Sequence, residues 1–243
     1  MEVQRKSLTQ LFVPICFEIL FYMLAGMVDT LMLSSVSDQA VGAVGTANTY
    51  IGVFIIMFGV ISSGMVAVMT QNIGAGKPGI AYQARQLGLL FNAIIGVLMS
   101  VFLAFFSGNI LKIVSIAPAL LEPAETYLKI VGGACFLNAL IPIFSSYLRV
   151  FGYTKQSLFA SVVGNVINFV LNAVFLYVMN LGVMGVAAAT VISRVINLII
   201  VAVMGAVLIK AKNSPERMSG IILILCLTNY LNSLRWVESN LKR

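Results

Sequence analysis

Long apolar stretches alternate with short polar breaks along most of this chain. Several of the stretches reach about 20 residues, the length that a helix needs to cross a hydrocarbon core of about 30 Å at about 1.5 Å per residue. The pattern therefore predicts membrane-spanning helices and an all-α membrane protein rather than a water-soluble fold. Six spans are expected, near residues 11–34, 45–70, 87–107, 126–148, 157–179 and 183–209.

The basic residues in the breaks indicate the orientation of these spans, because positive charge is retained on the cytoplasmic side of a membrane. With the N-terminus inside, only Lys112 and Lys129 fall outside. The cytoplasmic side then holds Arg5, Lys6, Lys77, Arg85, Arg149, Lys155, Lys210, Lys212 and Arg217. The sequence therefore predicts a cytoplasmic N-terminus.

The apolar pattern changes after Arg217. Residues 220–227 are only about eight apolar residues, or roughly 12 Å of helix, and this is too short to span. The leucines that follow recur at helical spacing beside basic residues, which suits a helix lying in the membrane interface. A truncated or frameshifted end is an equal alternative. We therefore divide the chain into a six-span lobe, residues 1–212, and a cytoplasmic or interfacial tail, residues 213–243.

Composition supports a membrane protein and weakens enzymatic interpretations. Of the residues, 60% are hydrophobic and 9% are charged, against roughly a quarter charged in soluble domains. The chain has no histidine, which removes the commonest general base and metal ligand. Cys16, Cys135 and Cys226 stand apart without the spacing of a metal site, so packing roles are expected. The net charge of +7 comes from basic residues scattered through the loops, which indicates membrane topology rather than a nucleic-acid partner.

Polar residues inside the spans are the candidates for function, because such groups are expensive in hydrocarbon and usually face one another or a water-filled cavity. On the first span, Glu18 and Asp29 are eleven residues apart, which places them on nearly the same helix face. The fifth and sixth spans repeat this arrangement, with Ser161, Asn165, Asn168 and Asn172 on one and Thr190, Arg194 and Asn197 on the other.

Counting about 1.5 Å per residue from the membrane surface sorts these side chains into two layers. The inner layer holds Glu18, Asn165 and Arg194, which we interpret as supporting or gating groups. The outer layer has oxygen ligands that suit a hard cation, or a carboxylate that takes and releases a proton. The predicted ion-coupling site consists of Asp29, Asn172 and Thr190 in the outer half, with Asn168 near the middle.

Structural interpretations of the same side chains stay open. Asparagine amides in membranes also form hydrogen bonds between helices, worth about 0.6 kcal/mol on average. Thr190 alone could be an ordinary intramembrane hydroxyl, and Asp29 alone an interfacial acid near the outer helix end. Glu18 and Arg194 carry opposite charges within about 4 Å of the same depth, so we expect them to form an ion pair.

Several short motifs keep a specific order and spacing along residues 8–212. They are Pro14 with Val28-Asp29-Thr30, VGAVGTAN from Val41 to Asn48, Thr70 to Ala75, RVFG from Arg149 to Gly152, the asparagine stripe of the fifth span, and GVMGVAAATVISR from Gly182 to Arg194. Together they resemble the MATE (multidrug and toxic compound extrusion) family. The resemblance implies a fold of twelve spans in two six-helix lobes, with substrate passing between the lobes by alternating access.

The resemblance also implies that Asp29, Asn168, Asn172 and Thr190 form a cation or proton site within the N-terminal lobe. Many prokaryotic relatives carry Asp at the position of Asn172, so the choice between Na⁺ and H⁺ stays open. This chain would supply one lobe only. Transport would need a second six-helix lobe, from a missing C-terminal half or another subunit, and we favour a gene fragment over a dimerising half.

The leading hypothesis is an antiporter in the plasma membrane that exports drugs or other amphipathic, often cationic compounds against inward Na⁺ or H⁺. Beyond that coupling ion, no cofactor, metal or catalytic activity is expected. A lipid-linked oligosaccharide flippase of the same superfamily is an alternative, although it would carry more cationic residues for phosphate than Arg194 alone. A non-transporting membrane assembly subunit is a further alternative, and it would show no ion-dependent flux.

Overall fold

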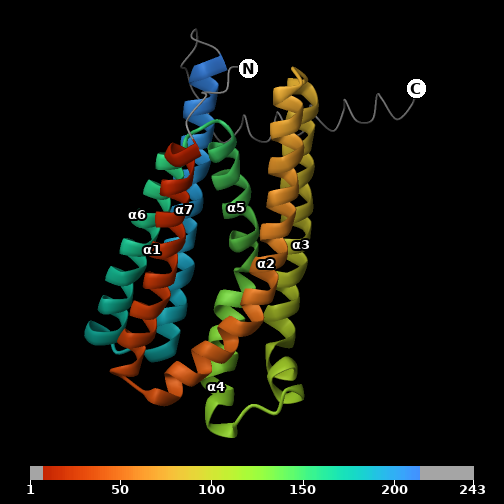
Figure 1. The fold of residues 1–243 in the computed structure, drawn as a ribbon. Coiled ribbons are helices and arrows are strands. Elements are labelled where there is room, and N and C mark those ends of the chain that lie inside the picture. The colour runs from red at the N-terminus through yellow and green to blue at the C-terminus, as the bar shows by residue number, and fades with distance from the viewer. Residues whose placement is uncertain (1–7, 214–243) are drawn as a thin grey trace.

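The computed structural model describes residues 8–213, which are helical apart from short turns (Figure 1). In chain order the elements are α1 (Leu8–Ser34), α2 (Asp38–Gly74), α3 (Pro78–Ile113), α4 (Pro118–Tyr127), the π-helix η1 (Leu128–Gly132), α5 (Cys135–Val150), α6 (Thr154–Ala173), the π-helix η2 (Val174–Val178) and α7 (Gly182–Asn213). The start of α1 and the end of α7 lie at the same end of the bundle (Figure 1). Apart from Asn213, the tail assigned to residues 213–243 falls outside the described residues.

Four helical segments of the described part are long and apolar enough to cross a membrane, namely α2, α3, α6 continued by η2, and α7. The bent run of α4, η1 and α5 adds a fifth if it counts as one span. α1 has 27 residues and packs against α6, and at about 1.5 Å per residue its length of roughly 40 Å also suffices for a bilayer. The described chain is an all-α membrane protein in which four or five of the six expected spans are long and apolar enough to cross a membrane, and α1 lies at the position of the first expected span.

Local sequence explains where several helices begin and end. Ser37 precedes α2, and its side chain accepts a hydrogen bond from the backbone N–H of Ala40 at 3.4 Å, as an N-cap residue does. Pro78 begins α3, where its missing N–H is harmless because the first turn has no intrahelical partner for that group. Gly76 lies in the turn between α2 and α3 with a φ of 71°, which glycine adopts without strain. These ends lie beyond the apolar windows, so α2 and α3 are longer than the spans predicted from hydropathy.

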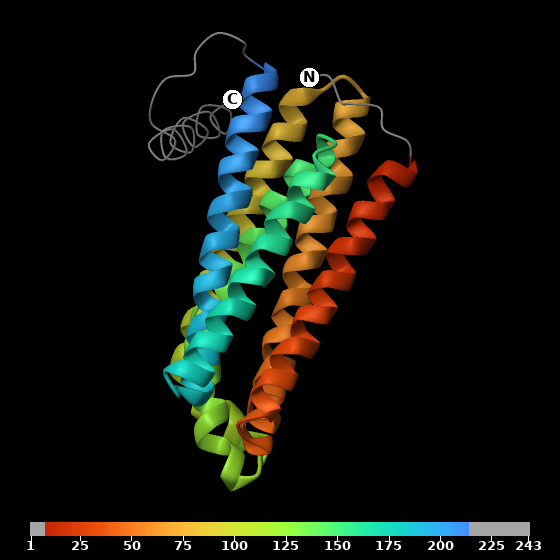
Figure 2. The same cartoon turned by 90° about the vertical axis from the view of Figure 1, so that its left-hand side faces the viewer.

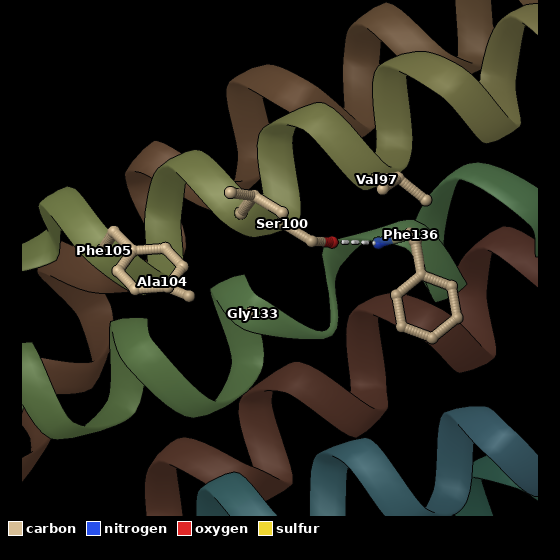
Figure 3. Close-up of a pocket in the computed structure, with 7 residues that line it drawn as sticks. Val97, Ser100, Ala104, Phe105, Gly133 and Phe136 are labelled. Carbon is tan, nitrogen blue, oxygen red and sulfur yellow. Dashed lines mark hydrogen bonds between the residues drawn. The ribbon is translucent and has the colours of Figure 1, made fainter.

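The fourth span is bent rather than straight. α4 and η1 meet α5 at an angle of 44°. At the break, the backbone N–H of Phe136 donates to Oγ of Ser100 on α3 at 2.8 Å (Figure 3), which satisfies a donor that the interrupted helix leaves without a partner. A mainly apolar recess of about 350 Å³ lies beside this hydrogen bond. The prediction of one span at 126–148 did not include this bend, because apolarity does not report the direction of a helix.

The bundle has α5 in its middle, with α1, α6 and α7 on one side and α2 and α3 on the other (Figure 1 and Figure 2). One buried apolar cluster includes Ile51, Phe58 and Leu128. A second cluster includes Met69 and Leu148 and lies toward the end of the bundle where α1 begins. The polar side chains singled out from the sequence lie mainly between α1 and α6, outside these two clusters.

Candidate ion-coupling site

The Asp29 carboxylate on α1 faces the asparagine stripe of α6. Nδ2 of Asn172 donates to Oδ1 of Asp29 at 2.8 Å and to Oδ1 of Asn168 at 3.3 Å. Turning the Asn168 amide places its nitrogen 3.0 Å from each Asp29 oxygen, and this orientation satisfies both groups. Asp29 and Asn172 are 143 positions apart in the chain, so the packing of α1 on α6 brings the three side chains together.

The two asparagines are shielded from the surroundings of the bundle. Asn172 is fully buried and Asn168 is 8% exposed. Oδ1 of Asn172 has no hydrogen-bond partner within the described residues. A buried amide oxygen without a partner is costly, and this one is free to accept a hydrogen bond or to bind a cation.

Thr190 lies on α7, and within residues 8–213 no hydrogen bond joins it to Asp29 or to the two asparagines. Its Oγ1 donates to the carbonyl oxygen of Val186 at 2.8 Å, which leaves the oxygen lone pairs of the hydroxyl available. The buried Tyr127 hydroxyl interacts with the side chains of Thr190 and Asn48. Three of the four predicted site residues are therefore in direct contact, and the fourth has different neighbours.

The groups available to bind an ion here are one carboxylate and neutral amide and hydroxyl oxygens. No three His, Cys, Asp or Glu side chains gather anywhere in the described part of the chain. Oxygen ligands of this kind suit hard cations better than transition metals. A cation at this contact would be held by Asp29 with the amide oxygens of Asn168 and Asn172, whereas no described contact brings Thr190 to them. A proton fits equally well. When the Asn168 amide is not turned, its oxygen lies 3.0 Å from each Asp29 oxygen, and a protonated Asp29 can donate a hydrogen bond to it.

In the inner layer, Glu18 pairs with Arg149 and not with Arg194. Nη1 of Arg149 lies 3.0 Å from Oε2 of Glu18. Arg194 on α7 instead donates to Oδ1 of Asn138 on α5. The expected ion pair between Glu18 and Arg194 is therefore wrong.

The error has a physical reason. Depth counted along each helix does not say which helices are neighbours, and α1 packs chiefly against α6. From the sequence, Arg149 was expected in a cytoplasmic loop, but it lies in the last turn of α5 with its side chain only 26% exposed. From this position its guanidinium group reaches α1.

Asn165, the remaining supporting residue, also contacts α1. Its Nδ2 donates to the backbone carbonyl oxygen of Phe21 at 3.4 Å. This is a hydrogen bond between helices of the kind that holds membrane bundles together. The geometry of Asn165 therefore favours the structural interpretation over a role as an ion ligand.

Comparison with known proteins identifies the family to which this arrangement belongs. Residues 14–174, more than half of the chain, match the MatE family model. The chain belongs to the MatE family. The matched part of this MatE chain includes Asp29, Asn168 and Asn172, but ends before Thr190.

The MatE chain is similar to transporters about twice its length. It is 36% identical over 197 residues to the uncharacterized transporter YisQ of Bacillus subtilis, covering 79% of this chain and 43% of YisQ. It is 29% identical over 206 residues to the probable multidrug resistance protein NorM of Thermotoga maritima, covering 78% and 42% of the two chains. Its fold matches a MOP superfamily transporter from Pyrococcus furiosus with a TM-score of 0.75 at 22% identity, covering 82% and 44%. The chain thus spans less than half the length of these relatives.

Three further residues belong in the description of this MatE lobe. Arg149 is part of the RVFG motif, but nothing in that motif indicates that the Arg149 side chain reaches α1. Asn138 is a carboxamide within an apolar span and carries the same sequence signal as Asn165, so it could be found by the same reasoning. Tyr127 is an aromatic residue at the start of an apolar span, and nothing in its sequence context distinguishes it from a packing residue.

Proposed function

We propose that this chain forms one lobe of a secondary active transporter that exports drugs or other amphipathic, often cationic compounds in exchange for Na⁺ or H⁺. The observation that carries this proposal is the contact of Asp29 with Asn168 and Asn172 between α1 and α6. The similarity to NorM, which is named as a probable multidrug resistance protein, supports the substrate class.

Ion binding at Asp29 would change the contact between two helices, because α1 carries the carboxylate and α6 carries its neutral partners. When Asp29 is ionised, the amide N–H groups of both asparagines can donate to it, and hydrogen bonds to a charged acceptor are strong. A proton on Asp29 turns one of its oxygens into a donor, so Asn168 would have to present its oxygen instead. A Na⁺ ion would also attract the amide oxygens. Either ion therefore exchanges the hydrogen bonds that hold α1 on α6, which shifts the balance between arrangements of the two helices.

Alternating access needs a second lobe against which this one can move. The chain covers less than half of YisQ and of NorM, so the transport activity belongs to a larger assembly. We propose that a complementary six-helix lobe completes the transporter in the plasma membrane, with the N-terminus of this chain in the cytoplasm.

The test is Asp29→Asn in a transporter that contains this chain and a second lobe. Asparagine keeps the size of the side chain but carries no charge and takes up no proton, so ion-driven efflux of a fluorescent organic cation from vesicles should be abolished. Membrane insertion should be unchanged. Glu125→Gln is the matched control, because Glu125 pairs with Lys129 at 2.7 Å within one helical run and not between helices. Efflux with normal ion dependence in the Asp29→Asn variant would refute the proposal.

A further inference from the structure

α1 is held in the lobe more by polar contacts than by apolar packing. Its buried apolar side chains, among those described, are Pro14 near its start and Met32 and Leu33 near its C-terminal end. Large apolar side chains along the rest of α1, such as Phe12, Phe17 and Leu24, are exposed. Lipid tails are as apolar as these side chains, so burial gives no hydrophobic drive for helices to associate in a membrane. Apart from Pro14, the position of the N-terminal half of α1 therefore depends on its polar contacts.

A network centred on one ion pair joins this half of α1 to three other helices. Glu18 accepts a hydrogen bond from Nη1 of Arg149 on α5 at 3.0 Å. Oγ of Ser157 on α6 lies 3.4 Å from each Glu18 oxygen and donates to the carboxylate. Nη2 of Arg149 donates to Oγ of Ser146 at 3.0 Å, and the hydroxyls of Ser146 and of Ser62 on α2 are 2.9 Å apart. We call these five residues the α1 clasp.

The charge of Arg149 is the part of the α1 clasp that the serines cannot replace. The side chains of Glu18 and Arg149 are only 18% and 26% exposed, and Ser157 is fully buried. Without the guanidinium group, a carboxylate would remain in hydrocarbon with hydroxyl partners alone, and an unpaired charge there is costly. Glu18 would then be more stable where its carboxylate reaches water at the membrane surface, which requires α1 to shift or rotate.

We infer that Arg149 is a positioning residue: acting through Glu18, it anchors the N-terminal half of α1 against α5 and α6, separately from the contact at Asp29. The two anchors are eleven residues apart on α1, or about 16 Å along the helix axis. The consequence rests on the proposed function: when an ion exchanges the hydrogen bonds at Asp29, the C-terminal half of α1 moves while the clasp holds the other half in place.

The test measures a distance within the full chain in lipid nanodiscs and needs no transport. Spin labels are placed at Phe12→Cys on α1 and Leu87→Cys on α3, because both side chains are exposed, by 63% and 53%. The native cysteines are replaced by serine in this background, at Cys16, Cys135 and Cys226. Glu18→Gln and Arg149→Gln should each broaden the distribution of distances between the two labels and shift its maximum.

Rescue distinguishes a paired charge from general packing. The exchange of both charges, Glu18→Arg with Arg149→Glu, should restore much of the narrow distribution, and Arg149→Lys should retain part of it because the charge is kept. Glu125→Gln, which removes a charge from a pair within one helical run, should leave the distribution unchanged.

Two results would overturn the inference. One is an unchanged distance distribution in both Glu18→Gln and Arg149→Gln, and the other is a distribution in the charge-exchange variant that is as broad as in either single variant. If the variants at Arg149 do not fold, Glu18→Gln and Ser157→Ala decide the matter by the same measurement, since both should broaden the distribution. Asp29→Asn should leave the distance between the labels at positions 12 and 87 unchanged. A failure of the coupling proposal would appear in efflux and not in this distance, so the two failures are distinguishable.

Discussion

At the scale of single residues, Asn172 determines how much negative charge the proposed coupling site offers. Its Nδ2 donates to Asp29, whereas its fully buried Oδ1 has no partner among residues 8–213. The amide therefore satisfies the Asp29 carboxylate without adding a second negative charge. Arg194 is close enough to act electrostatically on Asp29, so a cation at this site would be balanced by Asp29 alone and repelled by Arg194.

Asn172→Asp should therefore strengthen Na⁺ binding. Two carboxylates at the present distance of 2.8 Å would not both stay ionised without a cation or a shared proton between them. A unit charge near 4 Å contributes about 1–4 kcal/mol in water or near a protein surface, so affinity should rise about fivefold or more. Calorimetric Na⁺ titration of the purified chain at constant pH measures the change.

The matched control for this experiment is Asn165→Asp. Asn165 lies on the same face of α6, but it contacts the backbone of Phe21 and not Asp29. An equal gain of Na⁺ affinity in both variants would mean that charge anywhere on the α6 face is sufficient, and Asn172 would then lose its assignment as a site residue.

The sequence predicts which of these side chains share a helix face. Glu18 and Asp29 follow one helix face, as do Asn168 and Asn172, and a single packing of α1 on α6 brings Asp29 to both asparagines. The partner of Glu18 could not be predicted in the same way. Helical periodicity and depth place a side chain on its own helix, but the pair with Arg149 depends on where the end of α5 lies relative to α1.

At the scale of elements, the close approach of α3 to α5 depends on Gly96. A Cβ at this position would lie 2.7 Å from Cβ of Ala139 and 3.1 Å from Cα of Phe136. The second contact is with backbone, so a larger side chain cannot be accommodated by turning a neighbouring side chain. The contact lies next to the break between η1 and α5, so the bend of the fourth span and the packing of α3 are linked.

Gly96→Ala should accordingly destabilise the bundle by about 1–3 kcal/mol, as overpacking of a tight contact does. Thermal unfolding in detergent, followed by fluorescence, measures the effect. Gly59→Ala on α2 is the control, because nothing lies within 4 Å of a Cβ there and alanine is the better helix former by up to about 1 kcal/mol. If the two variants have the same melting temperature, α3 and α5 do not require glycine at their contact.

The bend itself lies beyond what the sequence pattern predicts. Residues 126–148 are apolar enough to indicate a span, and this expectation agrees with the positions of η1 and α5. A hydropathy window averages over apolar residues whatever the direction of the helix. The π-helical turn before Gly133 contacts α3, and the acceptor for the Phe136 N–H is Ser100 on the same helix, and hydropathy reports neither contact.

At the scale of the whole molecule, the helices alternate in direction, so each end of the bundle collects every second connection (Figure 1). The turns before α3 and α6 lie at the end where α1 begins, and the turn between α1 and α2 lies at the opposite end with α4. Lys77 and Lys155 belong to the first end. Asp38 and Glu122 belong to the second, together with Lys112 at the end of α3, so the first end is the more basic of the two.

This charge difference predicts that the end of the bundle with Lys77 and Lys155 faces the cytoplasm, because basic residues in short connections are retained there. The side chains of Lys77, Lys155, Asp38 and Glu122 are all exposed, so a cysteine at each position should react with a maleimide in a background without native cysteines. In intact cells, a maleimide that does not cross membranes should label Asp38→Cys and Glu122→Cys. Lys77→Cys and Lys155→Cys should be labelled only after the membrane is permeabilised. Labelling of position 77 or 155 in intact cells, with 38 and 122 protected, would reverse the orientation and place the clasp between Glu18 and Arg149 toward the outside.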